Sequence, residues 1–223
     1  MQITFIGSEP QAGNVRTFHF QKPDGFTFTA GQYQTWKLSS EGKPNDDNAH
    51  WFTISAAPSS ETLDITTRVT DSAFKQKLNS LQSGDMIEVE KVEGDFTWEG
   101  DEDVVLIAGG IGVTPYHSML VERAHNGKQL NATLIYGNRD DQVVFRDEFD
   151  ALTAQHPELK VHYLIGEQLT ADRLLEVAPE MRERATYLSG PEPMVDAIGD
   201  DLKSKGVVNL KQDWFPGYTE TNY

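Results

Sequence analysis

The hydrophobic rhythm of this 223-residue chain changes near residue 100, and that change limits the folds it can adopt. Before it, short β-rich runs alternate with clusters of Gly, Pro, Asn and Asp, at spacings typical of an antiparallel barrel or sandwich. The runs are QITFI, VRTFHF, YQTWKL, HWFTI, LDITTRV and MIEVEKV. One helix is expected in this half, at 72–81, where Phe74, Leu78 and Leu81 recur on one face.

After residue 103 the pattern alternates between strand and helix. The apolar runs VVLIA, ATLIY, VHYLI and TYLSG are each followed by a helical pattern, at 115–126, 145–155, 170–177 and 192–204. This alternation is typical of a parallel sheet built from βαβ units. The charged segment EGDED at 99–103 has no apolar residue and is expected to be a hinge. The sequence therefore predicts two domains, an antiparallel β-barrel at 1–98 and an α/β parallel-sheet domain at 104–223.

Composition excludes several classes of function. The absence of cysteine excludes disulfides, thiolate metal sites and iron-sulfur clusters held by this chain, and six scattered histidines predict no metal site. No run approaches the roughly 20 apolar residues of a spanning helix, and the first residues lack a signal-peptide pattern. We therefore expect a cytoplasmic protein without membrane insertion. The formal net charge of −16 argues against nucleic acid as a partner, although it could serve solubility alone.

The stretch AGGIGVTP joins a predicted buried strand to a predicted helix. Gly109, Gly110 and Gly112 carry no side chains, which lets backbone N–H groups approach a pyrophosphate at the carboxyl end of the strand. Thr114 and Pro115 follow, and Pro suits the first turn of a helix because its missing N–H has no partner there anyway. The alternative is a simple tight turn between a strand and a helix.

A second stretch, HWFTISAAPSS at 50–60, resembles the flavin signature of the ferredoxin-NADP reductase family, Arg-x-[Tyr/Phe]-[Ser/Thr]-x-x-[Ser/Ala]. The resemblance implies that Phe52 contacts the flavin ring, with Trp51 beside it, and that Thr53 hydrogen-bonds near the reactive nitrogen. His50 stands where the family has an Arg that pairs with the flavin phosphate. His is shorter and lacks the permanent charge of Arg, so FAD would lose about 1.5 to 3 kcal/mol of binding, or FMN would take its place.

The resemblance continues in order along the chain. TRVTDSAFKQKL matches the second flavin segment, with Thr70, Ser72, Ala73 and Phe74 as contacts, and AGGIGVTP matches the pyrophosphate loop of the pyridine nucleotide. YGNRDDQVVFRDEF matches the segment that lines the adenosine, which implicates Asn138 and Arg139. YLSGPEPMVDAI resembles the segment beside the nicotinamide, and DWFPGY resembles the acidic-aromatic tail. These two segments supply Ser189 (where many members have Cys), Gly190, Pro191, Met194, Asp213, Phe215 and Tyr218.

Each motif also has a purely structural interpretation. Phe52 could be core packing on a half-buried strand, and the helix at 72–81 could be a lid on the barrel. The segment at 190–193 could be a loop that enters a helix, and DWFPGY could be a C-terminal strand. Their joint occurrence in family order favours the flavoprotein.

The cofactor choice is open between NADPH and NADH. Arg139 could bind a 2′-phosphate, but Asp140 and Asp141 beside it would repel one. Arg146, four residues before Asp150, is expected to make a pair on a helix surface.

The resemblance implies an FAD-dependent NAD(P)H oxidoreductase in which the nicotinamide carbon lies about 3 to 3.5 Å from a flavin nitrogen. Thr53, Ser189 and Asp213 would be the catalytic residues, with Asp213 helping to manage the proton. Electrons would leave singly to a separate acceptor, such as ferredoxin, flavodoxin or a small molecule. The basic residues near the flavin site form either a docking patch for an acidic acceptor or a solvated face. They are Arg68, Lys75, Lys77 and Lys91.

Two other functions stay open on the sequence alone. A flavin or ferric reductase would treat flavin as a diffusible substrate, which the His50 departure favours. A non-catalytic module that senses NAD(P) or redox state would be consistent with the departures at His50 and Ser189.

Overall fold

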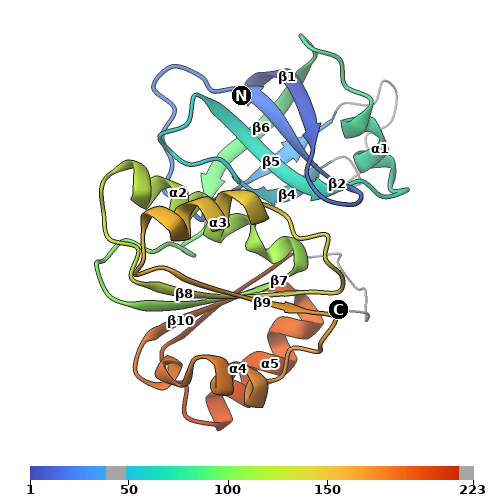
Figure 1. The fold of residues 1–223 in the computed structure, drawn as a ribbon. Coiled ribbons are helices and arrows are strands. Elements are labelled where there is room, and N and C mark those ends of the chain that lie inside the picture. The colour runs from blue at the N-terminus through green and yellow to red at the C-terminus, as the bar shows by residue number, and fades with distance from the viewer. Residues whose placement is uncertain (39–48, 216–223) are drawn as a thin grey trace.

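The computed structural model describes residues 1–38 and 49–215, which form two lobes (Figure 1). The first lobe holds a six-stranded antiparallel sheet in the order β4-β3-β6-β1-β2-β5, and the second holds a five-stranded parallel sheet in the order β11-β10-β7-β8-β9. An antiparallel barrel followed by an α/β parallel-sheet region is the fold class that the sequence predicts, and it is confirmed.

The six expected strands of the first lobe all form. They are β1 (Gln2–Pro10), β2 (Val15–Gln21), β3 (Tyr33–Lys37), β4 (Ala49–Thr53), β5 (Thr62–Arg68) and β6 (Met86–Glu93). Alternate side chains point inward and form one apolar core, which includes Phe20, Trp36 and Ile65. The sheet curls into a barrel because the backbone N–H of Ser55 donates to the carbonyl of Asp64 on β5, just beyond the end of β4.

The helix of the barrel lobe is shorter than expected. Helix α1 spans Ala73–Asn79, with Ser72 as its N-cap, whose hydroxyl accepts from the backbone N–H of Lys75 at 3.3 Å. Phe74 and Leu78 are buried in the barrel core, as the periodicity predicts. The last residues of the expected range lie outside the helix.

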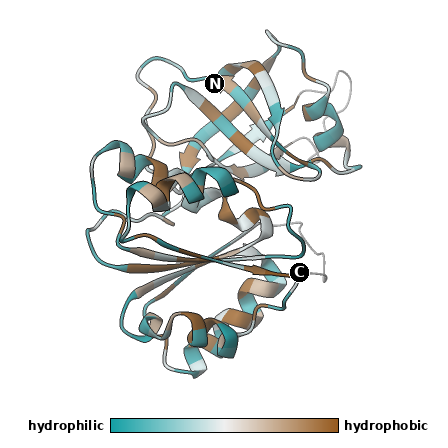
Figure 2. Ribbon diagram, viewed as in Figure 1, coloured by the Kyte–Doolittle hydropathy of each residue, from teal (hydrophilic) through white to brown (hydrophobic). Residues whose placement is uncertain are grey.

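The second lobe has helices on both faces of its sheet (Figure 1). Helices α2 (Thr114–His125) and α3 (Arg146–Gln155) lie on the face toward the barrel, and α4 (Ala171–Val177) and α5 (Glu192–Ser204) cover the other face. The strands are β7 (Val104–Gly109), β8 (Ala132–Asn138), β9 (Lys160–Ile165), β10 (Ala185–Pro191) and β11 (Leu210–Phe215). The central strands are apolar along their length (Figure 2), as expected for a sheet covered on both faces.

Four helices were expected in this lobe, and each begins within one residue of its predicted start. Short 3₁₀ turns precede α2, as η2 (Gly110–Val113), and follow α4, as η3 (Pro179–Arg182). Strand β11 begins three residues before the DWFPGY segment and ends within it, at Phe215.

The segment between the lobes is held in place. The indole of Trp98 is buried, and the guanidinium of Arg123 on α2 lies 3.8 Å from the centre of its ring. Arg123 also donates to the carbonyl of Gly100 at 2.7 Å. The expected hinge at 99–103 is therefore anchored to α2, and the domain limits at 98 and 104 stay a prediction. Within the described residues, no helix has the length and apolarity needed to cross a membrane.

Candidate functional site

On the barrel side, three aromatic rings gather where β4 meets α1. The ring of His50 lies 4.3 Å from that of Phe74, and Phe52 stacks on Phe74 at 5.7 Å with an interplanar angle of 29°. Phe52 and Phe74 are both buried and belong to the barrel core. The structural interpretation of Phe52 as core packing therefore holds, and its contact with a flavin is a proposal. Trp51, between His50 and Phe52 in sequence, is 54% exposed.

The next residue, Thr53, ends β4 and is buried. It pairs with Tyr33 on β3. Burial and then the charges of Glu93 and Asp213 raise the pKa of Tyr33 above its usual value. Asp213 belongs to the second lobe, and Lys211, two residues before it on β11, donates to the carbonyl of Thr97 in the first lobe at 3.3 Å, so β11 lies near the barrel lobe.

The remaining flavin candidates lie at the start of α1 or near the chain end. Thr70 is partly buried, and its carbonyl accepts from the side chain of Gln76 at 2.7 Å. Ser72 and Ala73 are exposed at the start of α1. The backbone of Phe215 ends β11, and Tyr218 lies outside the described residues.

The three glycines of the strand–helix junction differ in what requires them. A Cβ on Gly112 would lie 2.4 Å from the carbonyl oxygen of Ser189, and one on Gly109 would lie 2.3 Å from the sulfur of Met194. These two are needed for packing inside the lobe. Gly110 has φ +52, and a Cβ there would meet only Arg68 Nη2 at 3.4 Å and the side-chain oxygen of Asn138 at 3.9 Å. Gly110 is thus the glycine of the three whose α-carbon faces open space rather than the lobe interior.

The helix after this loop begins as predicted. Thr114 opens α2, and its hydroxyl donates to the carbonyl of Ile111 at 3.2 Å. Pro115 lies in the first turn, where no N–H is missed.

At the end of β10, Gly190 and Met194 pack together. A Cβ on Gly190 would lie 2.5 Å from the methyl carbon of Met194. Pro191 is the N-cap of α5. Ser189 is fully buried, and its hydroxyl has no hydrogen-bond partner among the described residues. A buried hydroxyl without a partner is costly, and it marks a place where a ligand group could bind.

Asp213 lies beside Ser189, because the two residues are paired in register on β11 and β10. Burial, together with the negative charge of Asp95, raises the pKa of Asp213 to about 6. The carboxyl group therefore changes charge close to neutral pH, which suits a group that holds or moves a proton.

Arg68, which the sequence suggests only as part of a basic patch, reaches the glycine loop of the other lobe. It ends β5, and its guanidinium crosses from the barrel to the second lobe, close to Gly110. On the barrel side it also contacts the side-chain oxygen of Asn14 at 3.5 Å. The sequence signal for it is its place in the second flavin segment, as the last residue of the strand before the loop that leads to Ser72.

The four basic residues considered as a docking patch do not form one. Arg68 faces Gly110, whereas Lys75 is buried on α1. Lys91 pairs with Glu93 at 2.9 Å, and Lys77 is exposed. An acidic acceptor therefore finds no single basic surface at these positions.

The residues expected near the adenosine lie at the end of β8. The side-chain nitrogen of Asn138 donates to the carbonyls of Asp140 and Gln142 at 3.0 and 2.9 Å, which shapes the loop. Arg139 and Asp141 are exposed. Arg146 pairs with Asp150 at 3.9 Å, as predicted for a helix surface, and also lies over the ring of Tyr163.

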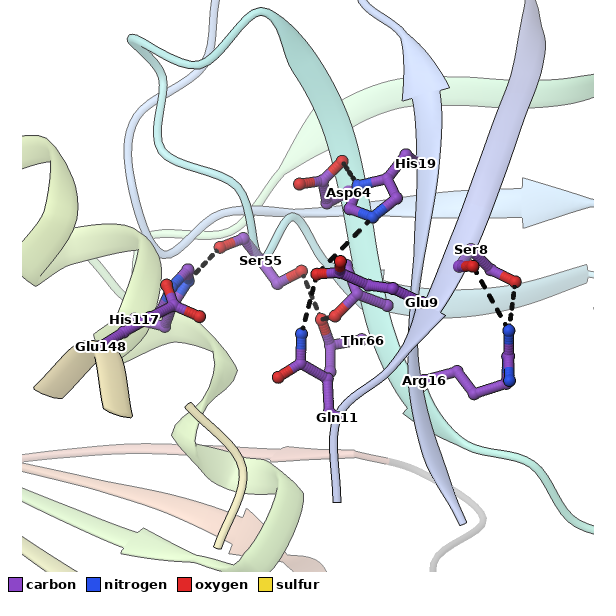
Figure 3. A network of polar contacts seen from close by, with 11 residues as sticks. Ser8, Glu9, Gln11, Arg16, His19, Ser55, Asp64, Thr66, His117 and Glu148 are labelled. Carbon is purple, nitrogen blue, oxygen red and sulfur yellow. Dashed lines mark hydrogen bonds and ion pairs between the residues drawn. The ribbon is translucent and has the colours of Figure 1, made fainter. Parts of the chain in front are cut away.

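The two lobes are joined by hydrogen bonds between α2 and the loop after β4 (Figure 3). Ser118 donates to the carbonyl of Ala56 at 2.6 Å, and Glu122 accepts from the backbone N–H of Ser59 at 2.7 Å. His117 lies 2.7 Å from the carbonyl of Ser55. Helix α2 begins at the glycine loop, and the loop after β4 begins at Thr53. These bonds therefore set the position of one half of the candidate site relative to the other.

Known proteins share this architecture. Residues 106–200 match the oxidoreductase NAD-binding domain family. A flavohemoprotein from Burkholderia sp. (strain TH2) is 29% identical over 88% of the chain, and the ferredoxin reductase component of 3-ketosteroid-9-alpha-monooxygenase from Rhodococcus rhodochrous is 26% identical over 92%. The chain spans 54% and 61% of the lengths of these two relatives.

A solved structure extends the likeness to nearly the whole chain. The flavohem-like FAD/NAD-binding domain of nitric oxide dioxygenase from Vibrio cholerae O1 biovar El Tor superimposes with a TM-score of 0.82 at 21% identity, covering 96% of this chain and 98% of that one. The ordered motifs, the two-lobe fold and these relatives agree. Residues 106–200 thus carry an oxidoreductase NAD-binding domain, and the chain as a whole is similar in fold to proteins of the ferredoxin-NADP reductase type.

Proposed function

We propose that this chain is an FAD-dependent NAD(P)H oxidoreductase that delivers electrons one at a time to a separate acceptor. One observation carries the proposal: the residues expected on the flavin side and those expected on the nicotinamide side converge where the lobes meet. Thr53 is paired with Tyr33, and the charge of Asp213 contributes to the raised pKa of Tyr33. Asp213 is in turn in register with Ser189.

The site fits a flavin and a nicotinamide nucleotide on features of this chain alone. The buried hydroxyl of Ser189, unpartnered among the described residues, could hydrogen-bond a polar ligand group at the end of β10. Gly110 leaves open the space in front of Arg68 and Asn138, where a pyrophosphate could approach the backbone. A flavin bound between the lobes would supply the redox chemistry, taking a hydride from the nicotinamide and releasing its electrons singly.

The chain's own residues bind, orient and move a proton. Thr53 would orient the ring edge from the end of β4, and Arg68 would neutralise the pyrophosphate charge from the barrel side. Oxidation of one NAD(P)H by two one-electron acceptors releases one proton. Asp213, with a pKa raised to about 6, is suited to carry that proton to solvent.

The proposed acceptor is a separate one-electron carrier, ferredoxin or flavodoxin, or a small molecule. The named relatives support an acceptor of this kind, since one is a ferredoxin reductase component and another is a flavohemoprotein. The strongly acidic chain and the dispersed basic residues favour an acceptor that does not depend on a basic docking patch.

The test is a visible spectrum of the purified full chain after incubation with FAD or FMN and gel filtration, followed by anaerobic titration with NADPH and, separately, NADH. The proposal expects flavin bands that co-elute with the protein and bleach with one nucleotide at far lower concentration. A protein that takes up neither flavin and oxidises neither nucleotide would overturn it, and would favour the non-catalytic sensor.

A second candidate is a reductase that uses flavin as a diffusible substrate. The observation in its favour is His50, whose ring packs against Phe74 at 4.3 Å and offers no permanent charge to a phosphate. Under this function, flavin separates from the protein on gel filtration while added flavin is still reduced by NAD(P)H.

A further inference from the structure

His117 lies on α2 where the helix faces the barrel, and both of its ring nitrogens face oxygen atoms (Figure 3). Nδ1 lies 2.7 Å from the carbonyl oxygen of Ser55. Nε2 lies 2.6 Å from Oε2 of Glu148 on α3. A carbonyl oxygen and an ionised carboxylate can only accept hydrogen bonds, so a ring that satisfies both contacts donates from both nitrogens.

A neutral ring cannot make both contacts. It carries one N–H, and whichever nitrogen lacks the proton directs a lone pair at an oxygen less than 3 Å away. Partial burial raises the pKa of Glu148, but the hydrogen bond and the charge of His117 outweigh this effect, and the pKa is lowered overall. The carboxylate therefore stays ionised across the neutral range and can accept a hydrogen bond from Nε2–H.

An aromatic ring holds the imidazole from a third side. Phe145 stacks on His117 with ring centres 3.8 Å apart and an interplanar angle of 17°. Phe145 is the one non-glycine residue of the described chain with positive φ, at 60°. A bulky side chain rarely adopts that conformation, so the stack is retained against backbone strain. A cation against an aromatic face is a favourable arrangement.

Within the described residues, the groups around the ring come from α3, the barrel loop and α2. From α3 the ionisable contact is Glu148, and from the barrel loop the contact is the uncharged Ser55 carbonyl. On α2 itself the nearest carboxylate along the helix is Glu122, which is bound to Ser59 and Asn126. Asp64, behind Ser55, pairs with His19 at 2.9 Å.

We propose that His117 is a positioning residue that works as a doubly protonated clamp between the lobes. Its two donated bonds join the loop after Thr53 to helices α2 and α3, and so fix the approach of the nicotinamide to the flavin. The proposal rests on the proposed function for its effect on rate. The clamp itself is a property of the folded chain.

The proposal makes the reaction depend on the charge of one ring. A ring that carried one N–H would lose one of the two bonds, and the loop after β4 would loosen. Hydride transfer then slows, because a displacement of about 1 Å in the reacting atoms can cost as much as a hundredfold in rate. At acidic pH the clamp weakens again when Glu148 takes up a proton.

The first test is ¹⁵N NMR of the His117 ring in the full chain without flavin, across pH. The expected result is two protonated nitrogens at and below neutral pH, with both signals sensitive to Glu148→Gln. A ring with one unprotonated nitrogen at pH 6 overturns the proposal. Since this readout needs no cofactor, it decides the clamp even if the chain does not reduce flavin.

The second test is the pH profile of flavin reduction by NAD(P)H in the flavin-loaded protein. His117→Phe keeps the stack on Phe145 and removes both donors. It is expected to slow reduction by about tenfold to a hundredfold and to remove the fall of the rate at high pH. Glu148→Gln is expected to move that fall to lower pH. An unchanged rate and profile in His117→Phe overturns the proposal.

The matched control is His156→Phe, which removes a second histidine–glutamate pair. His156 lies at the other end of α3, with Nδ1 3.6 Å from Oε1 of Glu158. This variant is expected to leave the rate and the pH profile unchanged. A loss equal to that of His117→Phe would show that the effect comes from α3 in general, and would overturn the assignment to His117.

Discussion

The two lobes build their halves of the site in different ways. In the parallel-sheet lobe, close backbone packing dominates, since Gly112 lies directly against Ser189 and Gly190. In the barrel, side chains from separate elements dominate, since His50 and Phe52 of β4 pack against Phe74 of α1. The first half is therefore intolerant of an atom added at Gly112, and the other depends on the shape and charge of a few side chains.

The largest predicted effect breaks the backbone half. In Gly112→Ala the new Cβ would lie 2.4 Å from the Ser189 carbonyl oxygen and 2.6 Å from the α-carbon of Gly190, with no flexible side chain to move aside. We expect a loss of about 3 kcal/mol or more in the free energy of unfolding, measured by urea denaturation. Gly7→Ala is the control, because no atom lies within 4 Å of its Cβ position. Equal stability of the two variants would contradict the packing argument.

The next prediction concerns the carboxyl group of Asp213, whose charge affects groups in both lobes. The pKa of Asp213 is raised to about 6, so ionising this carboxyl group destabilises the folded state. This destabilisation is absent below the pKa of the unfolded state and is fully present above pH 6. Asp213→Asn should therefore stabilise the protein by about 1 to 2 kcal/mol at pH 8 and by nothing at pH 3.5, while slowing turnover. Thermal unfolding at the two pH values is the measurement. A variant that is destabilised equally at both values would refute this origin of the effect.

A third prediction concerns Arg68, the barrel residue whose side chain reaches the glycine loop of the other lobe. Arg68→Ala removes the guanidinium that faces Gly110. We expect the dissociation constant for NADPH or NADH to rise about tenfold, with flavin affinity unchanged, because one charge-assisted phosphate contact is lost. Arg16→Ala, in the same lobe but bound to Ser8, is the control. Isothermal titration calorimetry measures the dissociation constants. Equal nucleotide affinity of the two variants would contradict the role given to Arg68.

The smallest predicted effect is on nucleotide choice. Arg139 is exposed at the end of β8, and Asp140 and Asp141 follow it directly. Arg139→Ala should reduce the preference for NADPH over NADH by a few fold, as expected for an exposed charge. The ratio of the two kcat/KM values measures it. An unchanged ratio would exclude Arg139 from the 2′-phosphate site.

The sequence predicted the architecture well because its periodicity is local. The six barrel strands and four helices of the second lobe follow from hydrophobic spacing and from Gly, Pro and capping residues, such as Ser72 before α1 and Pro115 in α2. The first half of β11 was missed because Leu210 and its neighbours alternate weakly.

The site was less predictable, because its decisive contacts join distant parts of the chain. Motif order grouped the glycines, but only the fold separates Gly110 from the two glycines required by packing. Arg68 lies in a quoted motif and His117 in none, but the contacts of both depend on partners across the lobe interface, at Gly110, Ser55 and Glu148. No local pattern encodes such a pairing.

The central claim is that the lobe interface holds a flavin and a nicotinamide within hydride-transfer distance. The most direct test is anaerobic stopped-flow reduction of the flavin-loaded full chain by NADPH or NADH carrying deuterium at the transferred position. The account predicts single-turnover bleaching with a primary isotope effect that persists at saturating nucleotide. A bound flavin that stays oxidised at saturating levels of both nucleotides would contradict it.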